Sequence, residues 1–211
     1  MPRTLIVTND FPPKQGGIEN YVHQLARRLP PDRIVVFTSS AEGDTAFDAT
    51  LPFKVIRART KVLVPTPHTV RGAAVLTERF GCDSVYFGAA ASLGLMAPYL
   101  RTLTRARRFI GSSHSHECFW TKTQPLRGAI RALGEGLDHI TYISDYSRAV
   151  IGRVLTPQAQ ARMVRLSPGV DPRQFWPESD GGGAYEFGLG SSRLQSSCRS
   201  RAWSRIRGRT R

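Results

Sequence analysis

Cysteine, lysine and long apolar runs are scarce in this 211-residue chain, and each scarcity excludes a class of protein. Cys82, Cys118 and Cys198 are odd in number and widely spaced, which fits reduced cytoplasmic thiols better than a disulfide framework or a metal site. The apolar stretches are short and interrupted, so we expect no membrane span. No apolar signal region follows the first basic residue, and we therefore expect no secretory leader.

Acidic residues are also few. The chain has 16 of them against 30 basic residues, which gives a net charge of +14. Residues 178–211 hold seven arginines against three acidic residues, and residues 1–177 hold 23 basic against 13 acidic residues. A basic body of this kind favours an anionic membrane surface or an anionic substrate, or it is simply a solvated basic surface. Nucleic acid is the rival partner, but no aromatic–basic interleaving or nucleic-acid motif supports it, so we expect none.

Strand-like and helical segments alternate along the first 166 residues. The strand-like runs are apolar rather than strictly alternating, which is typical of a parallel sheet covered by helices on both faces. We therefore predict an α/β, Rossmann-like fold that binds ligands at the carboxyl ends of its strands. The predicted strands are 5–7, 33–38, 53–57, 84–88, 108–112, 140–144 and 163–166, and later helices are 68–80, 90–103, 125–137 and 145–155.

A glycine pair, Gly16-Gly17, stands between the first strand and the first helix. Free backbone N–H groups and the positive end of the helix dipole at such a position suit a phosphate or sugar diphosphate. Glycine lets the ligand approach the backbone closely. A simple strand-to-helix turn is the equally weighted alternative. The apolar face of this helix is predicted to comprise Ile18, Tyr21, Val22, Leu25 and Leu29.

Polar side chains that could carry chemistry follow two predicted strands. His114 and His116 come after strand 108–112, where histidine could hold a hydroxyl, support a developing charge or relay a proton. With Glu117 they could instead bind a metal, although the spacing is weak evidence for that, and a structural loop histidine is a third possibility. Asn9 and Asp10 end the first strand, where they could bind sugar hydroxyls or form an Asx turn.

Several segments jointly resemble retaining family-4 glycosyltransferases of the GT-B fold. These are the Gly16-Gly-Ile18 loop, Ser113-His114, and Pro168-Gly-Val-Asp171 with Phe175 and Pro177. Thr8-Asn-Asp-Phe-Pro-Pro13, Tyr86-Phe-Gly-Ala-Ala-Ala91 and His114-x-His-Glu117 narrow the resemblance to actinobacterial GDP-mannose-dependent mannosyltransferases that act on phosphatidylinositol mannosides. The resemblance covers residues 4–177. An excess of arginine over lysine, 26 to 4, also suits a GC-rich genome.

The resemblance implies an enzyme of two Rossmann-like domains, of which residues 1–177 form the N-terminal, acceptor-side one. Gly16 and Gly17 would contact the donor diphosphate through backbone N–H groups, and Asn9 with Asp10 would face the acceptor inositol. His114 would lie beside the transferred sugar and support its oxocarbenium charge, with His116 as the second choice. No metal or cofactor is expected beyond the donor, GDP-mannose or another sugar nucleotide. Relatives usually have Thr-His-Gly where this chain has Ser113-His-Ser115, a departure that could alter the loop.

The final segment, 178–211, loses apolar periodicity and consists largely of arginine, serine and glycine, so we expect disorder. A frameshift after Pro177 is our hypothesis, since shifted codons for the tail could encode the start of the missing second domain. The chain alone is then expected to be inactive. By resemblance we place it in the cytoplasm, peripheral to the inner membrane face, with segment 61–72 near anionic lipid. The alternatives are a transferase with another donor and a soluble acceptor, or a non-catalytic protein whose tail binds nucleic acid.

Overall fold

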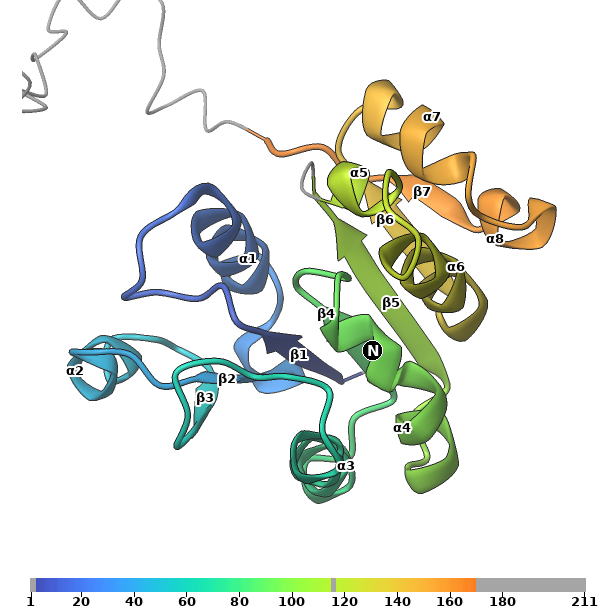
Figure 1. Cartoon of the computed structure of the whole chain (residues 1–211). Helices are drawn as coiled ribbons and strands as arrows, with labels where there is room; N and C mark the ends of the chain where they lie inside the picture. Colours follow the sequence, from blue (N-terminus) through green and yellow to red (C-terminus); the bar gives the residue numbers. More distant parts are fainter. Residues whose placement is uncertain (1–2, 115–116, 170–211) are drawn as a thin grey trace, which may run out of the picture. The chain divides into compact units, whose positions relative to one another are not determined.

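The computed structural model describes residues 3–114 and 117–169, which contain a seven-stranded sheet (Figure 1). All neighbouring strands pair in parallel, in the order β3-β2-β1-β4-β5-β6-β7. The predicted parallel α/β sheet is therefore confirmed. Its strands are β1 (Thr4–Thr8), β2 (Ile34–Ser39), β3 (Lys54–Ala58), β4 (Ser84–Phe87), β5 (Arg108–Ser113), β6 (His139–Tyr142) and β7 (Met163–Arg165).

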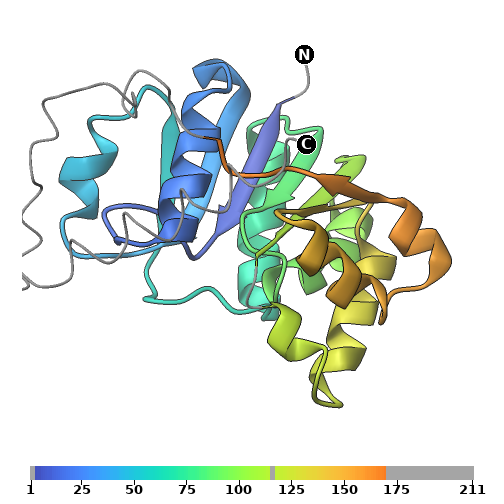
Figure 2. The same ribbon diagram turned by 90° about the horizontal axis from the view of Figure 1, so that it is seen from above.

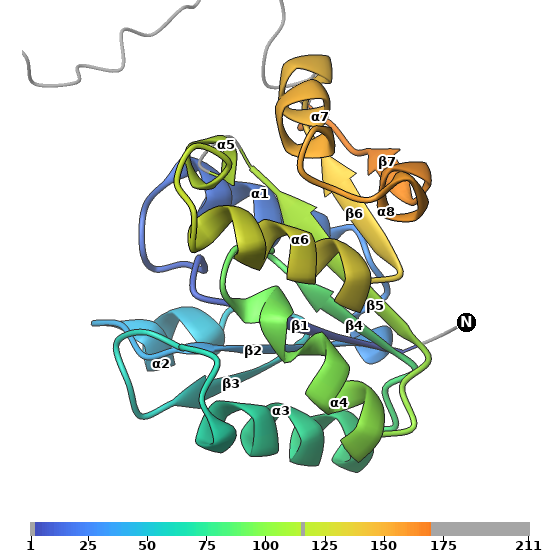
Figure 3. The same ribbon diagram turned by 45° about the vertical axis from the view of Figure 1, so that its right-hand side comes forward.

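Helices cover both faces of this sheet, because successive strand residues point to opposite sides. Leu5 and Val7 of β1 join a large apolar core, and Ile6 between them belongs to a second core. The main helices are α1 (Gly17–Arg27), α3 (Pro67–Arg79), α4 (Ala97–Leu103), α6 (Leu126–Gly136) and α7 (Asp145–Gly152). Helix α1 packs on the Ile6 side, whereas α3, α4 and α6 pack on the Leu5 side (Figures 2 and 3).

Local sequence determines where several helices begin. Thr66 caps α3 by accepting a hydrogen bond from the Thr69 N–H, and a proline follows at the first helical position. Ser144 and Ser147 form a reciprocal capping box at the start of α7. The shorter elements are α2 (Asp44–Asp48), α5 (Glu117–Trp120), α8 (Pro157–Ala161) and the 3₁₀ turns η1 (Pro31–Arg33) and η2 (Leu93–Met96).

Three predicted helix boundaries are wrong. Helix α1 ends at Arg27, so Leu29 lies beyond it and is 37% exposed. The predicted helix 90–103 is η2 followed by α4, and α7 ends at Gly152 rather than at 155. A separate helix, α8, then starts at Pro157, where a proline without an N–H is well suited to open a helix but not to continue one. The short α2 and α5 were not predicted, because single helical turns show no reliable periodicity.

The strand order creates a topological switch point between β1 and β4. The chain builds β2 and β3 on one side of β1 and then crosses to β4 on the other side. A crevice at the carboxyl ends of such strands is the usual ligand position in open α/β sheets.

Cys82 and Cys118 are buried free thiols. Within residues 3–114 and 117–169, no helix has the length and apolar character needed to cross a bilayer. Predictions for His116, Asp171 and the tail lie outside the described residues.

Candidate active site

Three loops meet at the carboxyl rim beside the switch point. They follow β1 at Asn9 and Asp10, β4 at Gly88, and β5 at His114. The His114 ring packs edge-on against Tyr21 of α1, with ring centroids 5.3 Å apart and an interplanar angle of 83°. His114 Nε2 lies 2.8 Å from the Gly88 carbonyl oxygen. The start of the first helix and the imidazole therefore converge on one rim, as the resemblance requires.

His114 is a buried histidine, with only 6% of its surface exposed. Burial lowers the pKa of its imidazole, and the Gly88 carbonyl and the Asp10 carboxylate oppose that shift only in part. Because the carbonyl can only accept a hydrogen bond, Nε2 carries the proton in this arrangement. The ring is thereby held in one orientation by the loop after β4.

Glu117 joins the loops that follow β4 and β5. Its Oε2 accepts a hydrogen bond from the His114 N–H at 2.7 Å, and its Oε1 lies 3.4 Å from the Ala91 N–H. The side chain is 1% exposed, and burial raises the pKa of its carboxyl to about 7. These bonds explain Glu117 as a residue that positions His114. Within the described part of the chain, no group of three or more His, Cys, Asp or Glu side chains could hold a metal.

Asp10 presents a half-buried carboxylate to the same rim. Burial raises the pKa of this carboxyl and repulsion from Glu19 adds to the rise, while His114 and Lys14 lower it. Its backbone N–H is bonded to Thr8 Oγ1 at 3.0 Å, which fixes the backbone turn. No hydrogen bond to the carboxylate is found within the described ranges, so Asp10 has acceptor capacity for a ligand hydroxyl. Its predicted contact with an acceptor stays a prediction.

Asn9 has a structural task that the sequence did not reveal. Its Nδ2 donates to the Leu63 carbonyl at 2.8 Å, and its Oδ1 accepts from the Leu63 N–H at 2.6 Å. Both ends of the amide therefore hold the loop between β3 and α3 against the rim. A contact between Asn9 and an acceptor stays a prediction. An acceptor that contacts Asn9 would have to bind a side-chain amide that already makes two hydrogen bonds to Leu63.

Two cations that sequence reasoning did not single out pin the loop between β1 and α1. Lys14 Nζ donates to Ser39 Oγ at 2.8 Å and lies 3.3 Å from the carbonyl oxygens of Asn9 and Lys61. Arg57 reaches the same loop from β3 and donates to the Pro12 carbonyl at 2.6 Å. No local pattern marks these residues, since their partners come from four different segments. Together they hold the approach to α1 in one conformation.

The start of α1 offers an open set of backbone donors. Gly16 at the N-cap has no side chain, and among the residues that the structure describes no side-chain cap bond is found at this helix start. A Cβ added at Gly17 would meet no atom within 4 Å, whereas one at Gly16 would meet the folded-back carboxylate of Glu19. Packing within the described structure therefore gives no reason for glycine at position 17. An anion that approaches the backbone closely would supply one.

Tyr21 has a polar role that its place on the predicted apolar face of the first helix did not reveal. Its hydroxyl donates a hydrogen bond to the Leu166 carbonyl at 3.3 Å. Burial raises the pKa of both Tyr21 and Tyr86. Tyr21 thus connects α1, His114 and the segment that follows β7.

Sequence comparisons agree with this geometry. Residues 15–174 match the family model described as Glycosyltransferase Family 4. A GDP-mannose-dependent monoacylated alpha-(1-6)-phosphatidylinositol monomannoside mannosyltransferase of Corynebacterium glutamicum is 38% identical over 181 residues, which cover 83% of this chain and 46% of that protein. A GDP-mannose-dependent alpha-(1-6)-phosphatidylinositol monomannoside mannosyltransferase of Mycobacterium tuberculosis is 36% identical over 185 residues, covering 84% and 47%. The chain spans about half the length of these relatives.

Solved structures with the same fold include two proteins that bear low sequence identity to this chain. Anabaena HepE in complex with UDP-glucose has a TM-score of 0.62 at 14% identity, covering 81% of this chain and 45% of HepE. Sucrose-phosphate synthase from Thermosynechococcus elongatus has a TM-score of 0.54 at 16% identity, covering 83% of this chain and 93% of that one. At these identities the likeness concerns the fold alone.

Proposed function

The chain belongs to glycosyltransferase family 4, and we propose that it is the acceptor-side half of a retaining mannosyltransferase. Its donor would be GDP-mannose and its acceptor a lipid of the phosphatidylinositol mannoside type. The observation that carries the proposal is the convergence of the uncapped start of α1, Asp10 and His114 at the rim between β1 and β4. The choice of donor and acceptor is supported by the names of relatives that share 33–38% identity with this chain.

Each group at the rim has a role that its chemistry permits. Backbone N–H groups at Gly16 and Gly17 would bind the donor diphosphate, where they and the helix dipole stabilise the negative charge that develops as the sugar leaves. His114, oriented by its contact with the Gly88 carbonyl, would position the transferred sugar and support its oxocarbenium character. Asp10 would accept a hydrogen bond from an acceptor hydroxyl. This division needs no metal or further cofactor.

Activity would require a second domain that closes the cleft and reads the donor base and sugar. We therefore propose that residues 1–211 alone transfer no mannose at a detectable rate. The proposed acceptor also implies a cytoplasmic protein that contacts the inner face of the cell membrane at its surface. The net charge of +14 supports such contact with anionic lipid, and we propose no nucleic acid partner.

Transfer by this chain joined to the second domain of the corynebacterial relative would test the function. We expect radiolabelled mannose from GDP-mannose to appear in the lipid fraction when phosphatidylinositol mannoside is supplied. His114→Ala is expected to lower kcat by about 100-fold or more, as loss of a positioned catalytic group typically does. His139→Ala is the matched control, because His139 is exposed at the opposite end of the sheet.

Three results would count against the proposal. Transfer from a UDP-sugar to a soluble acceptor, with no use of GDP-mannose or lipid, would keep the family but replace both substrates. Equal activities for the His114→Ala and His139→Ala variants would remove His114 from the site. Mannose transfer by residues 1–211 without a partner domain would contradict the proposed need for a second domain.

A further inference from the structure

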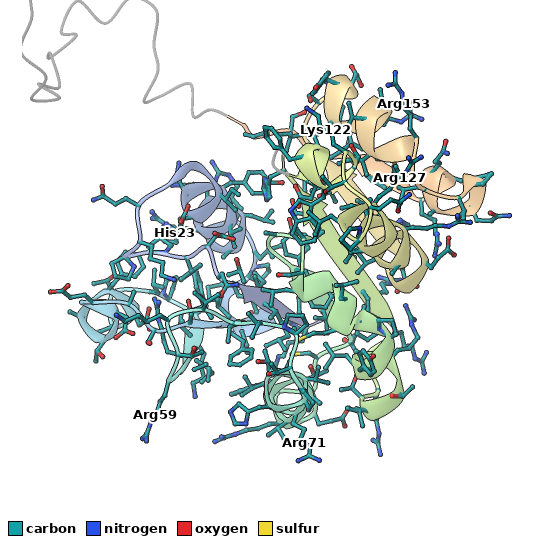
Figure 4. All side chains as sticks on the ribbon, viewed as in Figure 1. His23, Arg59, Arg71, Lys122, Arg127 and Arg153 are labelled. Atoms are coloured by element: carbon teal, nitrogen blue, oxygen red, sulfur yellow. The ribbon has the colours of Figure 1, made fainter. Side chains whose placement is uncertain are left out.

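A basic region lies between α6 and the turn that joins α7 to α8. It is a groove of about 550 Å³ whose lining includes Arg127, Arg131 and Arg153. Arg127 and Arg131 are four residues apart on α6 and so share one helix face, while Arg153 follows α7. Figure 4 places Lys122, Arg127 and Arg153 in one part of the molecule, and Arg59 and Arg71 in another.

The three groove arginines carry no internal partner. Within residues 3–114 and 117–169, none of their guanidinium groups makes a hydrogen bond or an ion pair, and all three residues are exposed. Some other arginines of this chain are paired within the fold, as Arg57 is with Asp48 at 2.8 Å. The nearest carboxylate on α6, that of Glu135, is bonded to the Thr156 hydroxyl. Three guanidinium groups around one groove, with a single carboxylate on α6, favour an anionic ligand.

Exposed apolar side chains lie in the segment that leads into α6. Phe119 of α5 is 68% exposed, and Lys122 Nζ lies 5.2 Å from the centre of its ring. Leu126, the first residue of α6, is 37% exposed and immediately precedes Arg127. An aromatic ring and an aliphatic side chain next to several cations are typical of a surface that rests in the headgroup region of a bilayer. Binding of a soluble anion would not bury these exposed apolar side chains.

We propose that the arginine groove, together with Phe119 and Leu126 in the segment that leads into α6, is the surface that docks on an anionic bilayer and takes lipid phosphates. Planar guanidinium groups bind phosphate oxygens in pairs, and their weak hydration suits the interface. The inference deepens the proposed function, since it assigns the membrane contact of a lipid-modifying enzyme to a stated surface. It differs from the expectation that segment 61–72 makes this contact.

Vesicle binding by the full 211-residue chain tests the proposal. Co-sedimentation is measured with phosphatidylcholine vesicles that contain or lack phosphatidylinositol. Replacing Arg127, Arg131 and Arg153 together by glutamine is expected to lower the partition coefficient on anionic vesicles about 100-fold, because each surface cation contributes about fivefold. The control replaces Arg105, Arg107 and Arg108 by glutamine, which changes the charge equally at the opposite end of the sheet. This control is expected to bind within a few-fold of the parent.

Four outcomes would overturn the assignment. Equal losses in the two triple variants would mean that diffuse charge drives binding, and no loss in the groove variant would mean that another segment, including the tail, does so. A loss confined to Arg59→Gln with Arg71→Gln would assign the contact to the neighbourhood of 61–72. Saturable binding of inorganic phosphate in the groove without vesicle binding would make it a site for a soluble anion.

The assay is independent of mannose transfer and does not depend on an active enzyme. Groove-dependent vesicle binding by a chain that fails the transferase test would leave the docking surface standing and remove the proposed reaction. Thermal unfolding of each variant provides the folding check. Substitutions of exposed, unpartnered side chains are expected to leave the midpoint unchanged within about 2 °C.

Discussion

Replacing Gly17 by alanine should separate stability from donor binding. Position 17 is the first residue of α1, and an added Cβ would meet no atom within 4 Å. Alanine is favoured over glycine in a helix by up to about 1 kcal/mol, so the variant should be as stable as the parent or slightly more so. For a domain of this size that corresponds to a rise of about 0–4 °C in Tm.

Donor binding should change in the opposite direction. The methyl group would occupy space through which phosphate oxygens approach the backbone N–H groups at the start of α1. Loss of one charge-assisted hydrogen bond costs about 1.5–3 kcal/mol, which raises the Kd for GDP-mannose roughly 10- to 150-fold. Gly17→Pro should weaken binding by a similar factor, because it removes one N–H at a helix position that tolerates proline.

Isothermal titration of GDP-mannose into the chain joined to a second domain measures this effect, and thermal unfolding measures stability. Gly128→Ala on α6 is the matched control, since that helical glycine also has no atom within 4 Å of an added Cβ. It should gain the same stability without any change in Kd. Undiminished donor binding by the Gly17→Ala variant, with its stability intact, would refute the assignment of this helix start to the diphosphate.

Three further changes probe how the rim is held together. Asn9→Ala should lose about 1–3 kcal/mol of unfolding free energy in urea titration, because both hydrogen bonds to Leu63 disappear, and Asn9→Asp should lose less. Gly88→Ala should lower the free energy of unfolding by about 1–3 kcal/mol, since the added Cβ would lie 2.7 Å from Thr8 Oγ1. An unchanged melting temperature of this variant would contradict that packing. The raised pKa of Glu117, about 7, predicts stability that is full below pH 4.5 and falls by up to about 3 kcal/mol as pH rises through 7. Glu117→Gln should abolish this slope, and an equal slope in both proteins would exclude Glu117 as its source.

The sequence predicted the sheet well, because buried parallel strands are apolar runs that need no partner to be recognised. All seven predicted strands are present, even the short run that begins at Met163. Boundaries were less predictable where a local signal competed with periodicity. Leu29 continues the apolar pattern of α1, yet the helix ends at Arg27. The predicted helix 145–155 ends early, at Gly152, and a separate short helix begins at Pro157.

The residues of the candidate site likewise fall into those that the sequence predicted and those that it did not. Gly16, Gly17, Asp10 and His114 could be named because each follows a strand or opens a helix, and the carboxyl ends of parallel strands share one edge. Lys14, Arg57 and Tyr21 could not be named. Their partners are backbone carbonyls and side chains of distant segments, and such contacts leave no periodic or spaced pattern in the sequence.

The order of apolar runs, turns and glycines determined the fold class, since parallel strands and the helices between them depend on local periodicity. The family was identified from motifs that resemble family-4 glycosyltransferases, such as Pro168-Gly-Val-Asp171, and the edge where ligands bind stays a prediction. Tertiary structure decided what each polar group does there. It turned Asn9 into an anchor for the loop at Leu63, made Glu117 a buried holder of the His114 backbone, and gathered three arginines around a groove. Those roles depend on burial and on neighbours brought together by folding, which no segment of the chain contains by itself.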